Sequence, residues 1–224
     1  MVAATLDEML RVLENPTRRR ILERLSRETH YPLQLSKELG VSQQAVVKHL
    51  RALQGAGLVS STEEKSDLGG PVRRAYSASQ RVTVQIDVGP SLFRAEMRPL
   101  AEGAGKVEGF AWAQEALDRA RSDKDRRRRV RTLAETVQRL NREVETLDGR
   151  RSYLLGLKEA CLREVHRSVE DVLGDYDERQ VLYCVLEEGG RAPDEIAERL
   201  DLREKVVQDL LRRIEREFLL EWGR

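Results

Sequence analysis

Polar and cationic side chains that could bind nucleic acid are concentrated in residues 42–51. Glutamine amides can form hydrogen bonds with base edges, and lysine and arginine can bind phosphate or guanine. Val46, Leu50 and Leu53 recur at helical spacing, which turns the other side chains toward the opposite face of a helix. We therefore predict a recognition helix over residues 43–56. Its contact residues would be Ser42, Gln43, Gln44, Val47, Lys48 and Arg51.

Two shorter amphipathic helices precede this segment and can share a small core with it. Their apolar sets are Ile21, Leu22 and Leu25, followed by Leu33, Leu35 and Leu39. Pro16 and Pro32 suit the first turns of these helices. Gly40 predicts a tight turn, and Ser42 predicts the N-cap of the recognition helix. The pattern is typical of a helix-turn-helix.

A β-hairpin is predicted directly after the recognition helix, over residues 58–78. The runs SSTEEK and VRRAYSAS are separated by the turn sequence SDLGGP. Lys65, Arg73 and Arg74 would lie near the tip of this hairpin, where cationic side chains can reach phosphate or the minor groove. The hairpin therefore reads as the wing of a winged helix.

The segments ENPTRRRIL, LSKELGVSQQAVVKHLRALQGAGLV and GGPVRRAY resemble the ArsR-type winged-helix repressors, especially archaeal members. The resemblance covers roughly the first 80 residues, and the ordered set of segments is more specific than any one of them. It implies a homodimer that binds double-stranded DNA, with one recognition helix in each half-site of an operator and a wing beside it. A winged helix that serves only protein contacts is the alternative.

The chain lacks the residues with which many ArsR relatives sense metals. Residues 32–39 contain no cysteine where that family's thiolate pair usually lies, and no Asp/His cluster follows. Cys161 and Cys184 are far along the chain, and a tetrahedral site needs three or four converging ligands. We therefore expect no metal and no other cofactor. Both cysteines are predicted to pack in helical cores.

Two basic features have less specific interpretations. Arg18, Arg19 and Arg20 could form either a solvated helix face or a set of phosphate contacts. His49 lies between buried and exposed positions of the recognition helix, so partial packing with an occasional phosphate contact is expected.

Composition favours an intracellular, non-catalytic protein. The formal net charge is +1 although 35% of residues are charged, so DNA affinity must come from local patches. No leading apolar run marks a signal peptide or a membrane span, and we expect a cytoplasmic protein without membrane contacts. The sequence has no glycine-rich phosphate loop, metal-ligand pair or nucleophile triad, and we expect no enzymatic activity.

A second hairpin and a long helical region follow the wing. Strict alternation over residues 82–88 predicts a hairpin that extends the wing sheet or links domains. Further on, an uninterrupted 3,4 spacing predicts a coiled-coil seam of Val130, Leu133, Val137, Leu140, Val144 and Leu147. Because Asp148-Gly149 is a turn signal, we predict two antiparallel helices, 123–147 and 151–173, over one long helix. Dimerisation is expected through this region.

The end of the chain repeats the pattern of its beginning. Shifting residues 16–59 by 161 positions lays them on residues 177–220 without a gap. Among the matched pairs are Leu25 with Leu186, Pro32 with Pro193, Leu39 with Leu200, Val46 with Val207, and Arg51 with Arg212. A second helix-turn-helix is therefore predicted, whose groove-facing residues would be Glu204, Lys205, Gln208, Asp209 and Arg212. Its two acids would repel phosphate, so we expect contacts with protein partners or its dimer mate more than with DNA.

The sequence as a whole predicts a mainly α fold with small β elements. Its predicted parts are a winged helix-turn-helix (1–80), a β-hairpin and linker (81–109), a helical coiled-coil or dimerisation region (110–174) and a helix-turn-helix-like domain (175–224). The predicted function is a dimeric, sequence-specific DNA-binding transcriptional regulator. The alternative is an architectural or assembly protein that chooses no DNA sequence. Gln43 and Gln44 favour the first, because an architectural binder would place more lysine or arginine there.

Overall fold

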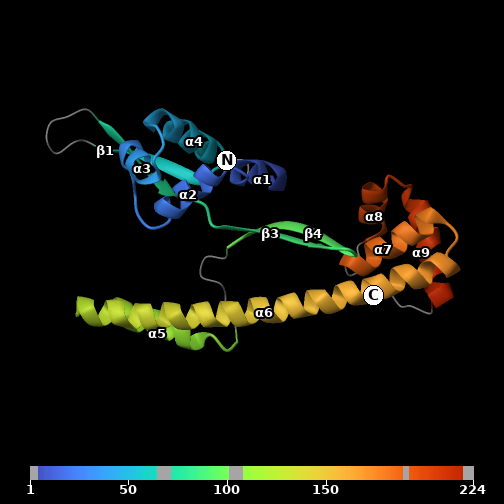
Figure 1. Cartoon of the computed structure of the whole chain (residues 1–224). Helices are drawn as coiled ribbons and strands as arrows, with labels where there is room; N and C mark the ends of the chain where they lie inside the picture. The colour runs from blue at the N-terminus through green and yellow to red at the C-terminus, as the bar shows by residue number, and fades with distance from the viewer. Residues whose placement is uncertain (1–4, 65–71, 101–107, 189–191, 219–224) are drawn as a thin grey trace. The chain divides into compact units, whose positions relative to one another are not determined.

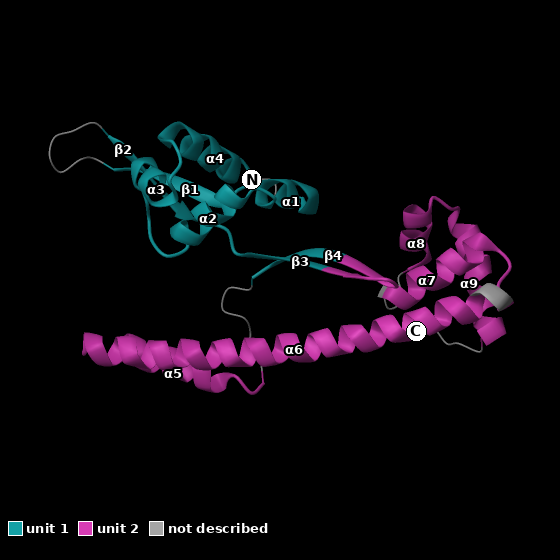
Figure 2. Ribbon diagram, in the orientation of Figure 1, with its two compact units in different colours: residues 1–86, 95–103 teal, residues 87–94, 104–224 magenta. Residues whose placement is uncertain are grey.

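The computed structural model describes residues 5–64, 72–100, 108–188 and 192–218. They form two compact units, one of residues 1–86 and 95–103 and the other of residues 87–94 and 104–224 (Figure 2). Helices predominate, and the described strands form two small two-stranded sheets (Figure 1). The predicted mainly α fold with small β elements is confirmed.

The first unit begins with four helices. They are α1 (Leu6–Leu13), α2 (Pro16–Leu25), α3 (Pro32–Leu39) and α4 (Gln43–Gly55). Thr5 and Glu8 form a capping box on α1, and the Asn15 side chain caps α2. Gly40 ends α3 in the left-handed region at φ 68°, and the Ser42 hydroxyl accepts a hydrogen bond from the amide of Ala45 at 3.2 Å. The predicted turn and N-cap therefore produce the helix-turn-helix.

The core of this unit consists mainly of the predicted apolar positions. Its buried residues are Met9, Ile21, Leu25, Leu35, Leu39, Val46, Leu50, Leu53, Leu58, Val59 and Tyr76. Leu33, which we had placed in this core, is 51% exposed. Leu33 lies about 200° around the helix axis from Leu35, because each residue of an α-helix advances about 100°. Its prediction as a core residue was wrong.

The wing consists of β1 (Val59–Glu64) and β2 (Arg73–Ala78), which pair antiparallel from Val59 opposite Ala78 to Glu64 opposite Arg73. A backbone bridge between His30 and Tyr76 ties β2 to the segment before α3. The predicted turn SDLGGP (66–71) and Lys65, which precedes it, lie outside the described residues.

The second predicted hairpin is present as β3 (Val82–Gly89) and β4 (Leu92–Pro99). These strands form a separate sheet, so the hairpin does not extend the wing sheet. Val82, Val84 and Met97 pack against the core of the first unit. Asp87 belongs to the second unit and accepts a hydrogen bond from Arg151 Nη1 at 3.0 Å, which lowers the pKa of Asp87.

The helical region differs from its prediction. One 47-residue helix, α6 (Arg126–Val172), runs through Asp148 and Gly149, where we had predicted a turn. A glycine inside a helix costs only about 1 kcal/mol, and hydrogen bonds continued through neighbouring turns offset that cost. An antiparallel helix pair forms elsewhere, because α5 (Ala111–Ser122) lies along the N-terminal part of α6 (Figure 1). The Arg139 guanidinium lies 3.8 Å from the centre of the Trp112 ring across this pair.

Three helices end the described chain: α7 (Tyr176–Glu188), α8 (Pro193–Leu200) and α9 (Glu204–Phe218). The repeat predicted from the sequence is visible in their bounds, since α8 matches α3 at both ends and α9 begins 161 residues after α4. Asp201, at φ 54°, takes the left-handed place of Gly40. Their buried core includes Val181, Leu182, Ile196, Val207 and Ile214, together with Val169 and Leu173.

The two cysteines have different surroundings. Cys184 is buried among these core residues, as predicted, whereas Cys161 is exposed on α6. Leu162, one residue further on, is the buried side chain at this turn, so Cys161 points about 100° away from it. The prediction that Cys161 packs in a core was therefore wrong.

Candidate nucleic-acid interface

Helix α4 presents a polar face to solvent because its apolar face is buried in the core. Val46, Leu50 and Leu53 have no exposed surface. The residues predicted to contact DNA are exposed or half-buried: Ser42, Gln43, Gln44, Lys48 and Arg51 are exposed, and Val47 is half-buried. No hydrogen bond or ion pair within the described chain engages the side chains of Lys48 and Arg51. Both cations are available to an external anion.

The wing contributes a second cationic group beside α4. Arg73 and Arg74 are both exposed on β2. Arg74 Nη2 lies 3.0 Å from Glu63 Oε1 on β1, and this hydrogen bond raises the pKa of Arg74. The Glu63 carboxylate thus holds Arg74 in place and neutralises part of its charge.

A groove of about 420 Å³ separates α4 from the wing. Val47, Arg51 and Gln54 line its helix side, and Pro32 lies at the start of α3. Glu63, Val72, Arg74 and Tyr76 line its wing side. The structure thus brings together three predicted contact residues, Val47, Arg51 and Arg74, from two elements.

A second depression of about 490 Å³ shares Pro32 and Arg74 with this groove. Its lining contains Gln43 and Arg73, so two more predicted residues lie at the same surface. The other lining residues are Tyr31, Leu33 and Gln34. Ser42, Gln44 and Lys48 line neither depression. Ser42 instead caps α4, and the other two are exposed on it.

Sequence reasoning missed Gln54 and the exposed Leu33 as members of this surface. Gln54 lies three residues after Arg51 and seven after Val47, which places it on the same helix face. Its Nε2 donates a hydrogen bond to the Ser61 hydroxyl of the wing at 3.3 Å. Helical spacing from Arg51 could have identified Gln54. The exposure of Leu33 follows from its position in the first turn of α3.

The arginines at the start of α2 have a structural role that the sequence did not predict. Arg18 Nη2 donates to the carbonyl of Arg11 at 3.1 Å, and Arg19 Nη1 donates to the carbonyls of Leu13 and Glu14 at 2.6 and 2.7 Å. These bonds satisfy backbone acceptors at the end of α1. Two of the three arginines are therefore neither a free solvated face nor free phosphate ligands.

His49 lies on the flank of α4, half-buried as expected. Burial lowers the pKa of His49, and the nearby charges of Arg18 and Lys48 lower it further. The neutral imidazole is therefore favoured in the folded chain.

The corresponding face of α9 is polar but largely self-neutralised. Glu204, Lys205, Asp209 and Arg212 are exposed and Gln208 is half-buried. Gln208 Nε2 donates to Glu204 Oε1 at 2.8 Å, and Arg212 Nη1 lies 3.4 Å from Asp209 Oδ1. The arginine that matches Arg51 thus already has a carboxylate partner.

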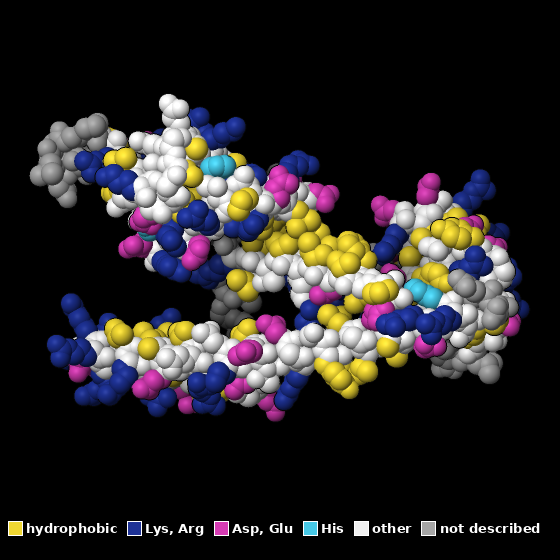
Figure 3. Space-filling view, in the orientation of Figure 1, with side chains coloured by type: hydrophobic (Ala, Val, Ile, Leu, Met, Phe, Trp, Pro, Cys, Tyr) yellow, Lys and Arg dark blue, Asp and Glu magenta, His cyan; other side chains and the backbone are white. Residues whose placement is uncertain are grey.

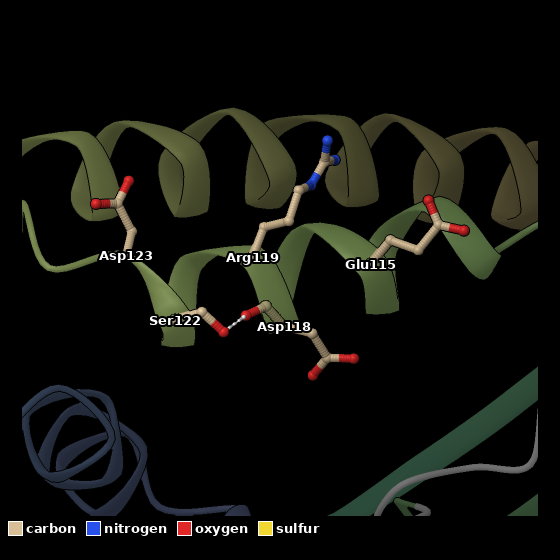
Figure 4. A pocket seen from close by; sticks show the side chains of 5 residues that line it. All are labelled: Glu115, Asp118, Arg119, Ser122 and Asp123. Atoms are coloured by element: carbon tan, nitrogen blue, oxygen red, sulfur yellow. Dashed lines mark hydrogen bonds between the residues drawn. The ribbon is translucent and has the colours of Figure 1, made fainter.

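A depression on α5 does not suit an anion. It measures about 690 Å³ and is lined by Glu115, Asp118, Arg119, Ser122 and Asp123 (Figure 4). The Ser122 hydroxyl donates to the carbonyl of Asp118 at 2.9 Å. Three carboxylates against one guanidinium would repel phosphate.

The described residues show neither a candidate metal cluster nor a candidate membrane span. Within the four described ranges, no three His, Cys, Asp or Glu side chains are placed to share a metal ion. Every described helix falls short of the length or the apolar character that crossing a bilayer requires.

Comparison with known proteins identifies the N-terminal region. Residues 13–62 match a family model described as a helix-turn-helix domain. The HTH-type transcriptional regulators CmtR of Mycobacterium bovis and Mycobacterium tuberculosis are 40% identical to the chain over 79 residues. The match covers 35% of this chain and 64% of the relatives, so the chain spans just under two thirds of their length.

Two solved structures are also similar to parts of the chain, each at a TM-score of 0.29. Reduced HlyU from Vibrio cholerae is 27% identical, over 33% of this chain and 70% of that one. An ArsR-like transcriptional regulator from Rhodococcus sp. RHA1 is 21% identical, over 68% of this chain and 91% of its own. The family model, the similarity to these regulators and the geometry of α2 to β2 agree that the N-terminal region is a helix-turn-helix domain.

Proposed function

We propose that the chain is a DNA-binding transcriptional regulator that acts as a homodimer and reads an operator through α4 and its wing. One observation carries the proposal: Arg51 and two amide side chains of α4, Gln43 and Gln54, lie with the arginines of β2 around two adjoining depressions of the helix-turn-helix region. A recognition helix that enters a groove of duplex DNA lies between two rows of phosphates. Cations on the helix and on the neighbouring wing can bind those phosphates.

The roles of the residues follow from their chemistry and place. Gln43 and Gln44, in the first turn of α4, supply amides that can bind base edges, adenine above all. Lys48 and Arg51 supply charges for phosphate or guanine, and Arg73 and Arg74 supply charge from the wing. Lys65 belongs to the same proposed set and lies outside the described residues.

The acidic residues of the wing should limit nonspecific affinity. Glu63 pairs with Arg74, and Glu64 on the same strand accepts a hydrogen bond from the Tyr31 hydroxyl. Each carboxylate reduces the attraction that the wing exerts on phosphate. A modest salt dependence is therefore part of the proposal.

The C-terminal helix-turn-helix is proposed to bind protein, either a partner or a second copy. Its α9 face pairs Arg212 with Asp209 and carries Glu204, which leaves little net positive charge for phosphate. We also propose four domains along the chain: 1–80, 81–109, 110–174 and 175–224.

Selection of bound fragments from a random duplex library, at about 150 mM salt, tests the proposal. We expect a two-fold motif whose half-sites lie about one helical turn apart, roughly 34 Å. The same selection with Arg51→Ala should fail, while Arg212→Ala, its counterpart on α9, should recover the motif. Fragments without enrichment from the unmodified chain would favour the architectural or protein-binding alternative.

A further inference from the structure

We propose that α6 pairs with the α6 of a second copy as an antiparallel coiled coil, because its exposed apolar a positions and its exposed apolar d positions lie in opposite halves of the helix. The two-fold axis would cross α6 between residues 145 and 146. This inference deepens the homodimer of the proposed function and rests on that part of it.

The two exposed sets follow one heptad register. In the N-terminal half, the a positions Val130, Val137 and Val144 are 53–66% exposed. In the C-terminal half, the exposed residues are at d: Leu147 and Leu154 are 50% and 63% exposed, and Cys161 is exposed. Figure 3 shows apolar side chains interrupting the charged surface along α6.

The remaining seam positions are occupied within the chain. Leu133 and Leu140, the d positions of the first half, are half-buried where α5 lies along α6. In the second half, the a residue Arg151 binds Asp87 and the a residue Lys158 donates to the carbonyl of Glu187. Each half of α6 thus leaves one type of seam position uncovered.

An antiparallel pair brings these two types together. In antiparallel coiled coils an a residue of one helix packs beside a d residue of the other, whereas parallel pairs match a with a and d with d. About the proposed axis, Val144 would meet Leu147, Val137 would meet Leu154, and Val130 would meet Cys161 of the second copy. Two-fold symmetry repeats each contact, so six apolar contacts form from residues that solvent now covers.

Charges beside the seam favour the same direction. The antiparallel register places the g residue Glu143 beside Arg150 of the second copy, twice. Within the described structure no ion pair or hydrogen bond engages either of these side chains. A parallel pair would instead place Glu143 beside Asp148 and would oppose Arg151 to Arg151, both like-charge contacts.

The self-complementarity of α6 identifies a second copy as the partner. The uncovered residues of one half fit the uncovered residues of the other half, and only a two-fold pair of identical helices offers both at once. A foreign helix would have to reproduce the shift from a to d in the middle of its own length.

Disulfide trapping with Val130→Cys in the full chain tests the direction of pairing. Residues 130 and 161 of one helix are about 46 Å apart, since each residue rises about 1.5 Å, so they cannot bond within a chain. We expect oxidation to give a covalent dimer that joins residue 130 to native Cys161, identified by peptide mass spectrometry. Adding Cys161→Ser should abolish that dimer, and Tyr153→Cys, at an exposed c position of the same helix, should trap none.

A parallel dimer would give the opposite results and overturn the proposal. The Val130→Cys chain would then form a bond between its two residues 130 that survives Cys161→Ser, and the unmodified chain would bond through its two Cys161 residues. A chain that stays monomeric at all concentrations in sedimentation equilibrium would overturn it as well.

Charge reversal gives an independent test by sedimentation equilibrium. Glu143→Arg should weaken the dimer several-fold by opposing Arg150, and adding Arg150→Glu should restore it. In a parallel pair the same single change would strengthen the dimer, because residue 143 would then attract Asp148. A dimer that persists without these effects, in a chain that still selects an operator, refutes the pairing and leaves the regulator intact.

Discussion

The chain contains two helix-turn-helix units whose backbones correspond and whose outer faces do not. Helices α3 and α8 have matching bounds at a shift of 161 residues, and Gly40 and Asp201 occupy the same left-handed position. The faces of α4 and α9 differ at positions that leave the core untouched. Gln43 is matched by Glu204 and Lys48 by Asp209, whereas Arg51 is matched by Arg212.

In such a unit, the residues that build the fold are separate from the residues that face a ligand. The apolar positions Val46 and Val207 are both fully buried, so the same pattern builds both cores. The charge of the outer face then decides whether phosphate is attracted or repelled. Similarity of helical pattern alone therefore does not carry a DNA-binding role from one unit to the other.

The largest expected effect is the loss of operator binding on removal of the unpartnered arginine. Arg51→Ala should lower operator affinity roughly tenfold or more, because a phosphate or guanine contact is lost. Arg212→Ala should leave affinity unchanged, since Arg212 is paired with Asp209. Fluorescence anisotropy with a labelled operator would measure both. Equal losses in the two variants would show that the units do not differ in the way proposed.

Exchanging the differing outward-facing residues of α4 and α9 should transfer part of the difference in DNA affinity. The double change Glu204→Gln with Asp209→Lys gives α9 the residues of α4 at these two positions. It removes two negative charges and adds one positive charge. We expect the variant to bind random duplex several-fold more tightly at low salt, with a steeper salt dependence. The converse pair, Gln43→Glu with Lys48→Asp, should weaken operator binding, because it places two carboxylates on the face of α4. Unchanged affinity in the α9 variant would mean that this face does not approach DNA.

A smaller effect is expected at the turn that the units share. Gly40→Ala should lower the free energy of unfolding of the first unit by about 1 kcal/mol, because its φ of 68° disfavours a side chain. Gly40→Asp should cost less, since aspartate tolerates this conformation, as Asp201 shows. Hydrogen exchange of peptides from α2 to α4 would follow this unit alone. Because no atom lies within 4 Å of the added Cβ, a much larger loss would contradict a purely conformational cost.

Local signals predicted both units well. Helical spacing, the two prolines at helix starts, Gly40 and Ser42 together determine where the helices begin and end. The gapless repeat predicted the second unit, because three helices kept the same phase through two turns. The exposed positions of α4 followed from the same spacing, since they are those that the core positions leave outside.

Features that depend on competition between distant parts of the chain were not predictable. The Asp148-Gly149 turn signal is real but weak, and the long helix around it outweighs the cost of one glycine. Which seam positions α5 would cover, and that Arg151 would bind Asp87, depends on contacts far apart in sequence. The same holds for Arg18 and Arg19, whose partners are carbonyls of a neighbouring helix.

The smallest expected effect concerns pH and again separates the two units. Position 210, which corresponds to His49, is a buried leucine. Because the pKa of His49 is lowered by burial and by Arg18 and Lys48, the unfolded chain binds a proton more readily than the folded chain. Neutral His49 therefore makes its full contribution to the free energy of unfolding above the pKa of the unfolded chain, about 6.5. That contribution is lost as pH falls through the lower pKa of the folded chain. His49→Leu should flatten the pH dependence of unfolding as pH falls below about 6.5, measured by exchange of α4 peptides. A variant as pH-sensitive as the unmodified chain would assign that dependence to other groups.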